Sequence, residues 1–332
     1  YARAGKRADL LACAQLLGFA PDEESAKQLL TALETAFQGR SLGAWPSELV
    51  DAVIKSGGGS LGLRLRQGNP EALQEALSRV ASSQTPLEER RELVTILGEI
   101  RQPQAEALLL QLVGGNHDPS LTITALTALQ TFQAPQIGER VIALYPDLQP
   151  DVRPVAQSLL SSRRGWALQL LHAVEAQQIN AATIPGATVR KMLLHEDAQL
   201  QTLVVKHFGN VQGATTSQML AEIKRLTKVI GTGSGVPHNG KQLYMQSCGK
   251  CHKLFTAGGE IGPNLTSFQR QDLQRVLVNV VNPSLEIREG YENYRVITED
   301  GRVLTGFVVD QDDQLVVLRG ADGQTTILPR ET

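Results

Sequence analysis

One pentapeptide, Cys248-Gly-Lys-Cys-His252, carries more chemistry than any other part of this sequence. The spacing C-x-x-C-H is the attachment motif of a c-type haem. Two thiols one helical turn apart can add to the two vinyl groups of one porphyrin, and the adjacent imidazole can then bind the iron. The motif therefore predicts one covalent haem c, with thioethers at Cys248 and Cys251 and an axial iron ligand at His252.

Two other uses of the cysteine pair compete with haem attachment. A structural zinc site needs a fourth ligand besides Cys248, Cys251 and His252. The third cysteine, Cys13, is far away in the sequence, and His238 is the only nearby histidine. A thioredoxin-like redox pair needs a strand before the motif and a βαβ setting, which the pattern does not give. Haem attachment is therefore the favoured interpretation.

The residues after the motif resemble a known family. Gly262-Pro-Asn-Leu265 follows His252 by ten residues and resembles the G-P-x-L loop of class I cytochromes c. In that family the proline carbonyl accepts a hydrogen bond from Nδ1 of the axial histidine, which fixes the imidazole ring. The resemblance implies that Pro263 and Leu265 belong to the haem site.

Two further positions match the same family. Arg270 stands where class I cytochromes c often place an arginine near a haem propionate. Gly240 and Tyr244 resemble the glycine-x-x-x-aromatic face of the first helix, where a small residue lets a second helix cross closely. Taken alone, Tyr244 is typical of a core residue. The resemblance implies haem-binding roles for Arg270 and Tyr244.

The sequence departs from the family at the sixth iron ligand, which is not identified. The family usually supplies a methionine after its middle helix, and the corresponding stretch 282–290 contains none. Met245 precedes Cys248 by only three residues, too few to reach the distal face. Nor does the pattern give a final helix to pack on Gly240 and Tyr244.

The C-terminal part, residues 238–332, resembles the planctomycete/verrucomicrobial-type haem-binding domain family. In that family a β-meander is inserted before a methionine-containing loop and a last helix, so we expect the distal ligand to follow the sequence given. The domain often comes after helical repeats and a β-propeller dehydrogenase-like domain. The matching segments are Asn282–Ser284, Gly290–Tyr294, Asp300–Gly306 and Ile327–Glu331.

Residues 1–230 predict one helix after another, because their apolar residues recur at helical spacing. A weak repeat starts near residue 86, where Ile96–Pro103 is followed 32 residues later by Ala128–Pro135. Helix pairs at a period of 30 to 40 residues are typical of an α-solenoid. This stretch resembles HEAT repeats, and an irregular helical bundle is the alternative.

After a Gly/Ser/Pro-rich linker at 231–237, the pattern predicts two short helices and then changes its period. From about residue 291 to 329, apolar residues alternate and Asp-Gly or Asp-Asp pairs mark turns, which predicts a small antiparallel β-meander. The strands are expected at 294–298, 303–309, 315–318 and 325–328. The expected fold is thus mainly α: a HEAT-like solenoid at 1–230 and a cytochrome c-like domain at 238–332 with an inserted meander.

Composition limits the classes of function. The 332 residues suggest about two domains, and the hydrophobic fraction of 42% is enough for a sizeable core. A formal net charge of −2 gives no basic surface for nucleic acid. No apolar run approaches the roughly 18 residues of a membrane span, so no transmembrane segment is expected.

The first functional hypothesis is single-electron transfer, to or from a redox partner protein or a linked dehydrogenase-like domain. The alternative is a haem-based ligand sensor or a peroxidase-like enzyme with an open distal site. A third hypothesis makes the helical repeats a scaffold for partners. Whether the chain is itself an enzyme stays open. Haem c is attached outside the bacterial cytoplasm, so we expect a periplasmic or otherwise exported protein.

Overall fold

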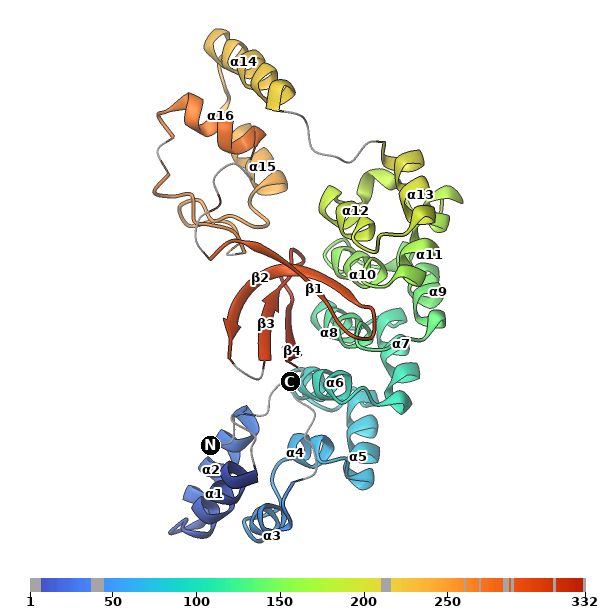
Figure 1. Ribbon diagram of the computed structural model, residues 1–332, viewed down its shortest axis with the longest axis vertical. Helices are drawn as coiled ribbons and strands as arrows, with labels where there is room; N and C mark the ends of the chain where they lie inside the picture. The colour runs from blue at the N-terminus through green and yellow to red at the C-terminus, as the bar shows by residue number, and fades with distance from the viewer. Residues whose placement is uncertain are drawn as a thin grey trace.

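A computed structural model describes residues 7–36, 45–209, 216–259, 261–268, 270–282, 287, 290–312 and 315–330. Within these residues the fold is mainly helical, with sixteen α-helices and one four-stranded antiparallel sheet near the C-terminal end (Figure 1). The mainly helical class and the C-terminal sheet expected from the sequence are confirmed.

Thirteen of the helices precede residue 210 and include every helical run expected there. They are α1 (Arg7–Gly18), α2 (Glu23–Ala36), α3 (Ser47–Lys55), α4 (Leu61–Arg66), α5 (Pro70–Ala81), α6 (Leu87–Glu99), α7 (Glu106–Gly114), α8 (Pro119–Leu129), α9 (Pro135–Leu144), α10 (Arg153–Leu160), α11 (Arg164–Glu175), α12 (Gly186–Leu193) and α13 (Ala198–Phe208). Short 3₁₀ turns lie at Pro103–Ala105, Tyr145–Asp147 and Ala181–Thr183.

Several of these helices begin where a capping side chain meets a free backbone N–H group. Asn69 caps α5 by accepting from the N–H of Ala72, and Asp197 caps α13 by accepting from Gln199 and Leu200. Such caps satisfy N–H groups that have no partner inside the helix. They explain why the chain starts new helices at these points.

Two hydrophobic cores hold the helices together. The larger one is continuous from Leu65 in α4 to Val204 in α13, with Trp166 fully buried within it. The smaller one joins α1 to α4 and includes the buried thiol of Cys13. Each helix of the larger core buries its apolar face against neighbouring helices.

Several hydrogen bonds between neighbouring helices join residues that lie 32 or 33 positions apart, and others join residues 30, 31 or 34 apart. Helices α6 and α8 approach closely at Gly98, where a Cβ atom would lie 2.8 Å from the Cβ of Ala128. Equivalent positions of successive helix pairs therefore meet. The bonds at 32 or 33 positions include those of Arg66 to Glu99, Thr131 to Gly98, Trp166 to Ala134, Lys191 to Ser158 and Arg164 to Asp197.

The sheet has the order β1-β2-β3-β4, with every neighbouring pair antiparallel. It consists of β1 (Asn293–Ile297), β2 (Val303–Gln311), β3 (Leu315–Arg319) and β4 (Thr325–Pro329). Gly301 and Gly323 have positive φ angles of 75° and 80° in the Asp-Gly turns, which L side chains rarely adopt. The meander follows the predicted strands, with β2 continuing two residues further past an irregularity between Val308 and Asp310.

The sheet lies against the concave side of the curved row of helices α6 to α12 (Figure 1). The backbone N–H of Val303 at the start of β2 donates to the carbonyl of Ser162, 2.8 Å away. The sequence assigns this meander to the same unit as the C-x-x-C-H motif. In the structure the meander also contacts the helices of residues 1–230 directly, and its assignment to one unit with the motif stays a prediction.

The three remaining helices are α14 (Thr216–Thr232), α15 (Pro237–Ser247) and α16 (Leu273–Val281). Helix α14 packs against α16. The expected linker at 231–237 differs in extent, because α14 continues through Thr232 and α15 starts at Pro237, leaving 233–236 non-helical. A helix tolerates Gly231 in its last exposed turn, where little packing is lost.

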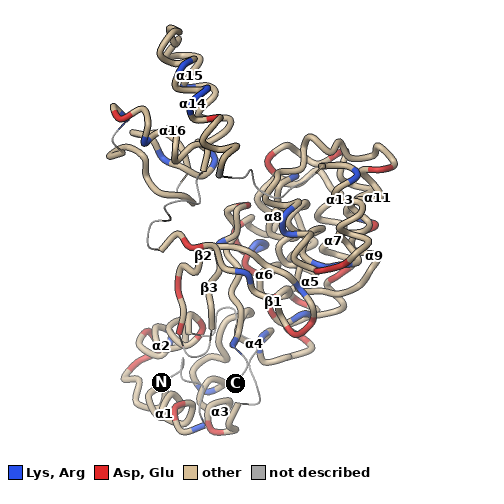
Figure 2. The backbone as a smooth tube through the Cα atoms, turned by 45° about the horizontal axis from the view of Figure 1, so that its top comes forward, with Lys and Arg blue, Asp and Glu red and all other residues tan. Residues whose placement is uncertain are grey.

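Charged residues of both signs are interleaved along the helices (Figure 2). In the part of the chain that the structure describes, no helix is both long enough and apolar enough to cross a membrane.

Candidate haem-binding site

The C-x-x-C-H motif forms a tight turn at the C-terminal end of α15. The N–H groups of Cys248 and Gly249 both donate to the carbonyl of Tyr244, at 2.8 and 2.7 Å. The N–H groups of Cys251 and His252 then donate back to the carbonyl of Cys248, at 3.1 and 2.9 Å. One turn of chain thus separates the two cysteines, as thioether bonds to one porphyrin require.

His252 is held by the loop that follows it. Its Nδ1 lies 2.9 Å from the carbonyl oxygen of Pro263. A carbonyl oxygen can only accept, so Nδ1 carries a proton and donates it to this oxygen. Among the described residues Nε2 has no hydrogen-bond partner. This is the arrangement in which a histidine binds a metal, with the second nitrogen oriented by a protein carbonyl.

Gly262 allows the imidazole to lie where it does. A Cβ atom at this position would lie 2.6 Å from Cε1 and 2.8 Å from Nδ1 of His252. Gly262 also donates its N–H to the carbonyl of Cys251 at 2.8 Å. Any larger residue would push the ring away from the Pro263 carbonyl.

Two further glycines shape the site, and the sequence analysis missed them. A Cβ atom on Gly258 would lie 2.1 Å from the carbonyl oxygen of His252, and one on Gly259 would lie 2.3 Å from that of Lys250. Gly258 also has a φ angle of 113°. The only signal in the sequence is the Gly-Gly pair itself. Such a pair predicts a turn but does not indicate that backbone carbonyl groups pack against it.

Tyr244 and Leu265 close the site through the backbone. The Tyr244 hydroxyl donates to the carbonyl of His252 at 2.7 Å, which ties α15 to the end of the motif. The N–H of Leu265 donates to the carbonyl of Lys253 at 2.8 Å. Both residues predicted at the haem site therefore contact the motif or its flank.

Arg270 makes contacts that the sequence did not foresee. Its Nη1 donates to the carbonyls of Leu265 and Thr266, at 2.8 and 2.9 Å. Its guanidinium carbon lies 4.9 Å from the ring centroid of Phe255, a cation–π distance. Arg270 thus clamps the loop after His252, and its role near a propionate stays a prediction.

The segment around the motif has apolar side chains but little core. Among the described residues from 233 to 282, Leu277 is the only buried hydrophobic side chain. Leu243, Phe255 and Val280 are 61–67% exposed. A segment this short rarely folds without a metal, a disulfide or another added core. The exposed apolar side chains of this segment could pack against a large apolar group such as a porphyrin.

The thiols do not fit a redox pair or a zinc site. Cys248 and Cys251 are unbridged. Burial raises the pKa of Cys251, and the motif follows a helix C-terminus, whereas reactive dithiols lie at helix N-termini with lowered pKa values. Among the described residues, no group of three or more His, Cys, Asp or Glu side chains is placed to hold a metal ion.

The sixth ligand stays unassigned. A Cβ atom on Gly249 would lie 2.9 Å from Sδ of Met245, so this sulfur lies beside the motif, as its spacing predicts. Met192 is fully buried in α12. Most of the stretch 282–290 lies outside the described residues.

Comparison with known protein families, with curated protein sequences and with solved structures finds no match to this chain.

Proposed function

We propose that the segment from residue 238 to 282 forms a cytochrome c-like module that carries one covalent haem c and transfers single electrons. The observation that supports this most directly is the C-x-x-C-H turn with His252 Nδ1 bound to the Pro263 carbonyl. In a haem site the C-x-x-C-H turn would supply the thioether thiols and the iron ligand, and the Pro263 carbonyl would orient that ligand. A purely structural turn needs neither arrangement.

Each residue has a defined task in this proposal. Cys248 and Cys251 form the thioether bonds, and His252 binds the iron through Nε2. Pro263 orients the imidazole, and Gly262 leaves room for it. The haem supplies the Fe(III)/Fe(II) couple that accepts and releases one electron. The protein makes no substrate bond in this process, so the module is not an enzyme by itself.

We also propose that the helices of residues 1–230 form a HEAT-like α-solenoid. The interhelical hydrogen bonds at a spacing of 32 or 33 residues support a HEAT-like α-solenoid. An irregular bundle has no reason to repeat its contacts at spacings that cluster between 30 and 34 residues. In this view the solenoid positions the haem module for a redox partner or for a linked dehydrogenase-like domain, in the periplasm or another exported location.

Production of the chain with periplasmic haem-maturation machinery tests the proposal. We expect one haem per chain that survives denaturation, seen as a haem-stained band and a pyridine haemochrome spectrum. Cys248→Ala with Cys251→Ala should abolish the covalent haem, whereas Cys13→Ala, a change in the helical core, should keep it. A wild-type chain that folds without covalent haem would overturn the proposal.

The ferrous protein separates electron transfer from the alternative function. A low-spin spectrum without CO binding supports electron transfer with six ligands. A high-spin spectrum with rapid CO binding would show an open distal side and favour a ligand sensor or a peroxidase-like enzyme. The first result also requires a sixth ligand to the iron.

A further inference from the structure

Positive charge is concentrated around the C-x-x-C-H motif. Residues 216–282, which we call the basic segment, contain eight Lys or Arg and three Asp or Glu, a formal net charge of +5. The whole chain has 32 basic and 34 acidic residues, so the rest contains 24 and 31 and has a net charge of −7. Figure 2 shows basic residues of this segment on α14, α15 and α16. The motif therefore lies in a basic part of an otherwise acidic chain.

The carboxylates of the basic segment are few and already engaged. Glu222 accepts from Arg225, one turn further along α14, at 2.7 and 2.8 Å. Asp272 caps α16 by accepting from the N–H of Arg275. The third carboxylate, Glu260, lies outside the described residues. Four lysines are exposed and form no ion pair within 4.0 Å among the described residues: Lys224, Lys228, Lys241 and Lys250.

Two of these lysines lie at the motif itself. Lys250 stands between Cys248 and Cys251, the two cysteines that would form the thioether bonds. Lys241 precedes Cys248 by seven residues, about two helical turns, so the two lie on the same side of α15. Cys248 is itself exposed. A molecule that approaches the motif from the side of this thiol therefore meets positive charge first.

The other two lysines border an open groove between α14 and α16. The groove has a volume of ≈ 350 Å³, and Lys224, Lys228 and Gln274 contribute its polar lining. Leu220 and Ile223 supply apolar surface to the same groove. Protein interfaces combine apolar contact with a polar rim in this way. The groove thus offers a protein partner an apolar contact beside two cations.

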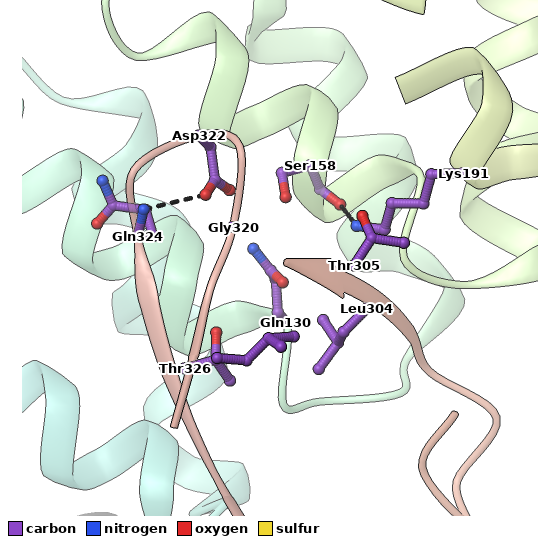
Figure 3. A pocket seen from close by; sticks show the side chains of 10 residues that line it. Gln130, Ser158, Lys191, Leu304, Thr305, Gly320, Asp322, Gln324 and Thr326 are labelled. Atoms are coloured by element: carbon purple, nitrogen blue, oxygen red, sulfur yellow. Dashed lines mark hydrogen bonds between the residues drawn. The ribbon is translucent and has the colours of Figure 1, made fainter. Parts of the chain in front are cut away.

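The buried cations between the sheet and the helices differ from these exposed lysines. Arg163 is paired with Asp300, with 2.8 Å between Nη2 and Oδ2. Lys191 and Asp322 both line the small cavity at this interface, where Figure 3 shows them approaching from a helix and from a turn of the sheet. These cations face carboxylates of the same interface. They are therefore not available to another molecule.

We propose, on the basis of the proposed function, that the basic segment is the surface on which an acidic face of a redox partner protein docks. Opposite charges attract over about a Debye length, ~10 Å at 0.1 M salt, and turn the segment toward the partner before contact. The haem propionates would offset only part of the charge of +5. An anionic membrane is the poorer partner, because it extends beyond the segment and repels the acidic rest of the chain.

The salt dependence of electron transfer tests the surface in the haem-bearing protein. Its ferrous form is oxidised in a stopped-flow instrument by the anion hexacyanoferrate(III) or by the cation tris(phenanthroline)cobalt(III). Between ~10 mM and ~0.5 M salt, the rate constant with the anion should fall about tenfold or more, and that with the cation should rise. The charge of the whole chain, −2, predicts the opposite signs. Those opposite signs would overturn the proposal.

Matched charge changes locate the effect. Lys241→Gln with Lys250→Gln should markedly weaken the salt dependence with hexacyanoferrate(III). Lys27→Gln with Lys55→Gln, at exposed positions of α2 and α3, changes the net charge equally and should leave the salt dependence as it is. Equal effects of the two double variants would mean that the charge of the whole chain governs the rate, and would contradict a docking surface at the motif.

Two controls separate this proposal from its neighbours. Haem staining shows whether each chain carries covalent haem. A wild-type chain without it overturns the proposed function and the docking surface together, whereas a haem-bearing chain with the wrong salt dependence overturns only the docking surface. Salt-sensitive sedimentation with phosphatidylglycerol vesicles would assign the basic segment to a membrane surface instead of a protein. We expect the chain to stay in the supernatant.

Discussion

Nδ1 of His252 lies 2.9 Å from the carbonyl oxygen of Pro263, eleven residues further along the chain. This contact places a proton on Nδ1 and fixes the orientation of the imidazole ring. It is made possible by Gly262, where a side chain would collide with the ring. The orientation of one imidazole therefore depends on the backbone of two successive residues.

Gly262→Ala adds only one methyl group but should strongly disturb the His252 imidazole and the loop at Pro263. The added methyl group would lie 2.6 Å from Cε1 of His252, so either the ring or the loop must move. We expect a large loss of covalent haem or an altered Soret spectrum after production with haem-maturation machinery. Gly231→Ala, in the last turn of α14, is the matched control, because its Cβ would meet nothing within 4 Å. It should keep the spectrum, and alanine favours the helix by up to about 1 kcal/mol.

Tyr244→Phe should loosen the junction between α15 and the motif. It removes the hydroxyl that donates to the His252 carbonyl at 2.7 Å. The expected loss in the free energy of unfolding is about 0.5–1.5 kcal/mol, measured by denaturant titration. Tyr294→Phe, at a half-exposed position of β1, should change it little. Equal effects of the two variants would show that the hydrogen bond contributes nothing.

Local patterns predicted most of the elements. Alternating apolar residues and Asp-Gly turns indicated the four strands, because strand period and turn chemistry are both encoded within a few residues. The motif and the Gly262-Pro263 pair likewise mark the site by their spacing. Their geometry follows from short loops, which leave the chain few other conformations.

The contacts between distant elements were not predictable in this way. Arg163 and Asp300 lie 137 positions apart, and neither belongs to a periodic pattern. A buried ion pair has no local sequence signal, since the same residue types occur on any solvated surface. The position of the sheet against the helices therefore emerged only from the structure, as did the engagement of Arg270 by its own loop.

The Arg163–Asp300 pair should contribute far more than ion pairs on the surface. Both side chains are 9% exposed, so removal of one leaves a buried charge without a partner. Arg163→Met or Asp300→Asn should each lower the free energy of unfolding by about 3–5 kcal/mol. The exposed pair Arg225–Glu222 is the control, and its disruption should cost less than about 1 kcal/mol.

Acid should weaken the same contact. The pKa of Asp300 is lowered in the folded chain, so its carboxylate stabilises the fold at pH values above the ordinary aspartate pKa of about 3.9. That stability is lost as pH falls below about 4, because only the unfolded chain then readily takes up the proton. The acid limb of a stability–pH curve should be shallower in Asp300→Asn than in the wild type.

Alkali should strengthen the fold through Lys191. Burial lowers its pKa from 10.5 to about 8, so in the folded chain the ammonium loses its proton first. Between these two values the unfolded chain binds more protons, and the free energy of unfolding must rise with pH. We expect this rise from about pH 8 to 10.5 in the wild type and its absence in Lys191→Met. A wild-type curve as flat as that of the variant would show that Lys191 keeps its ordinary pKa and that the interface already compensates its charge.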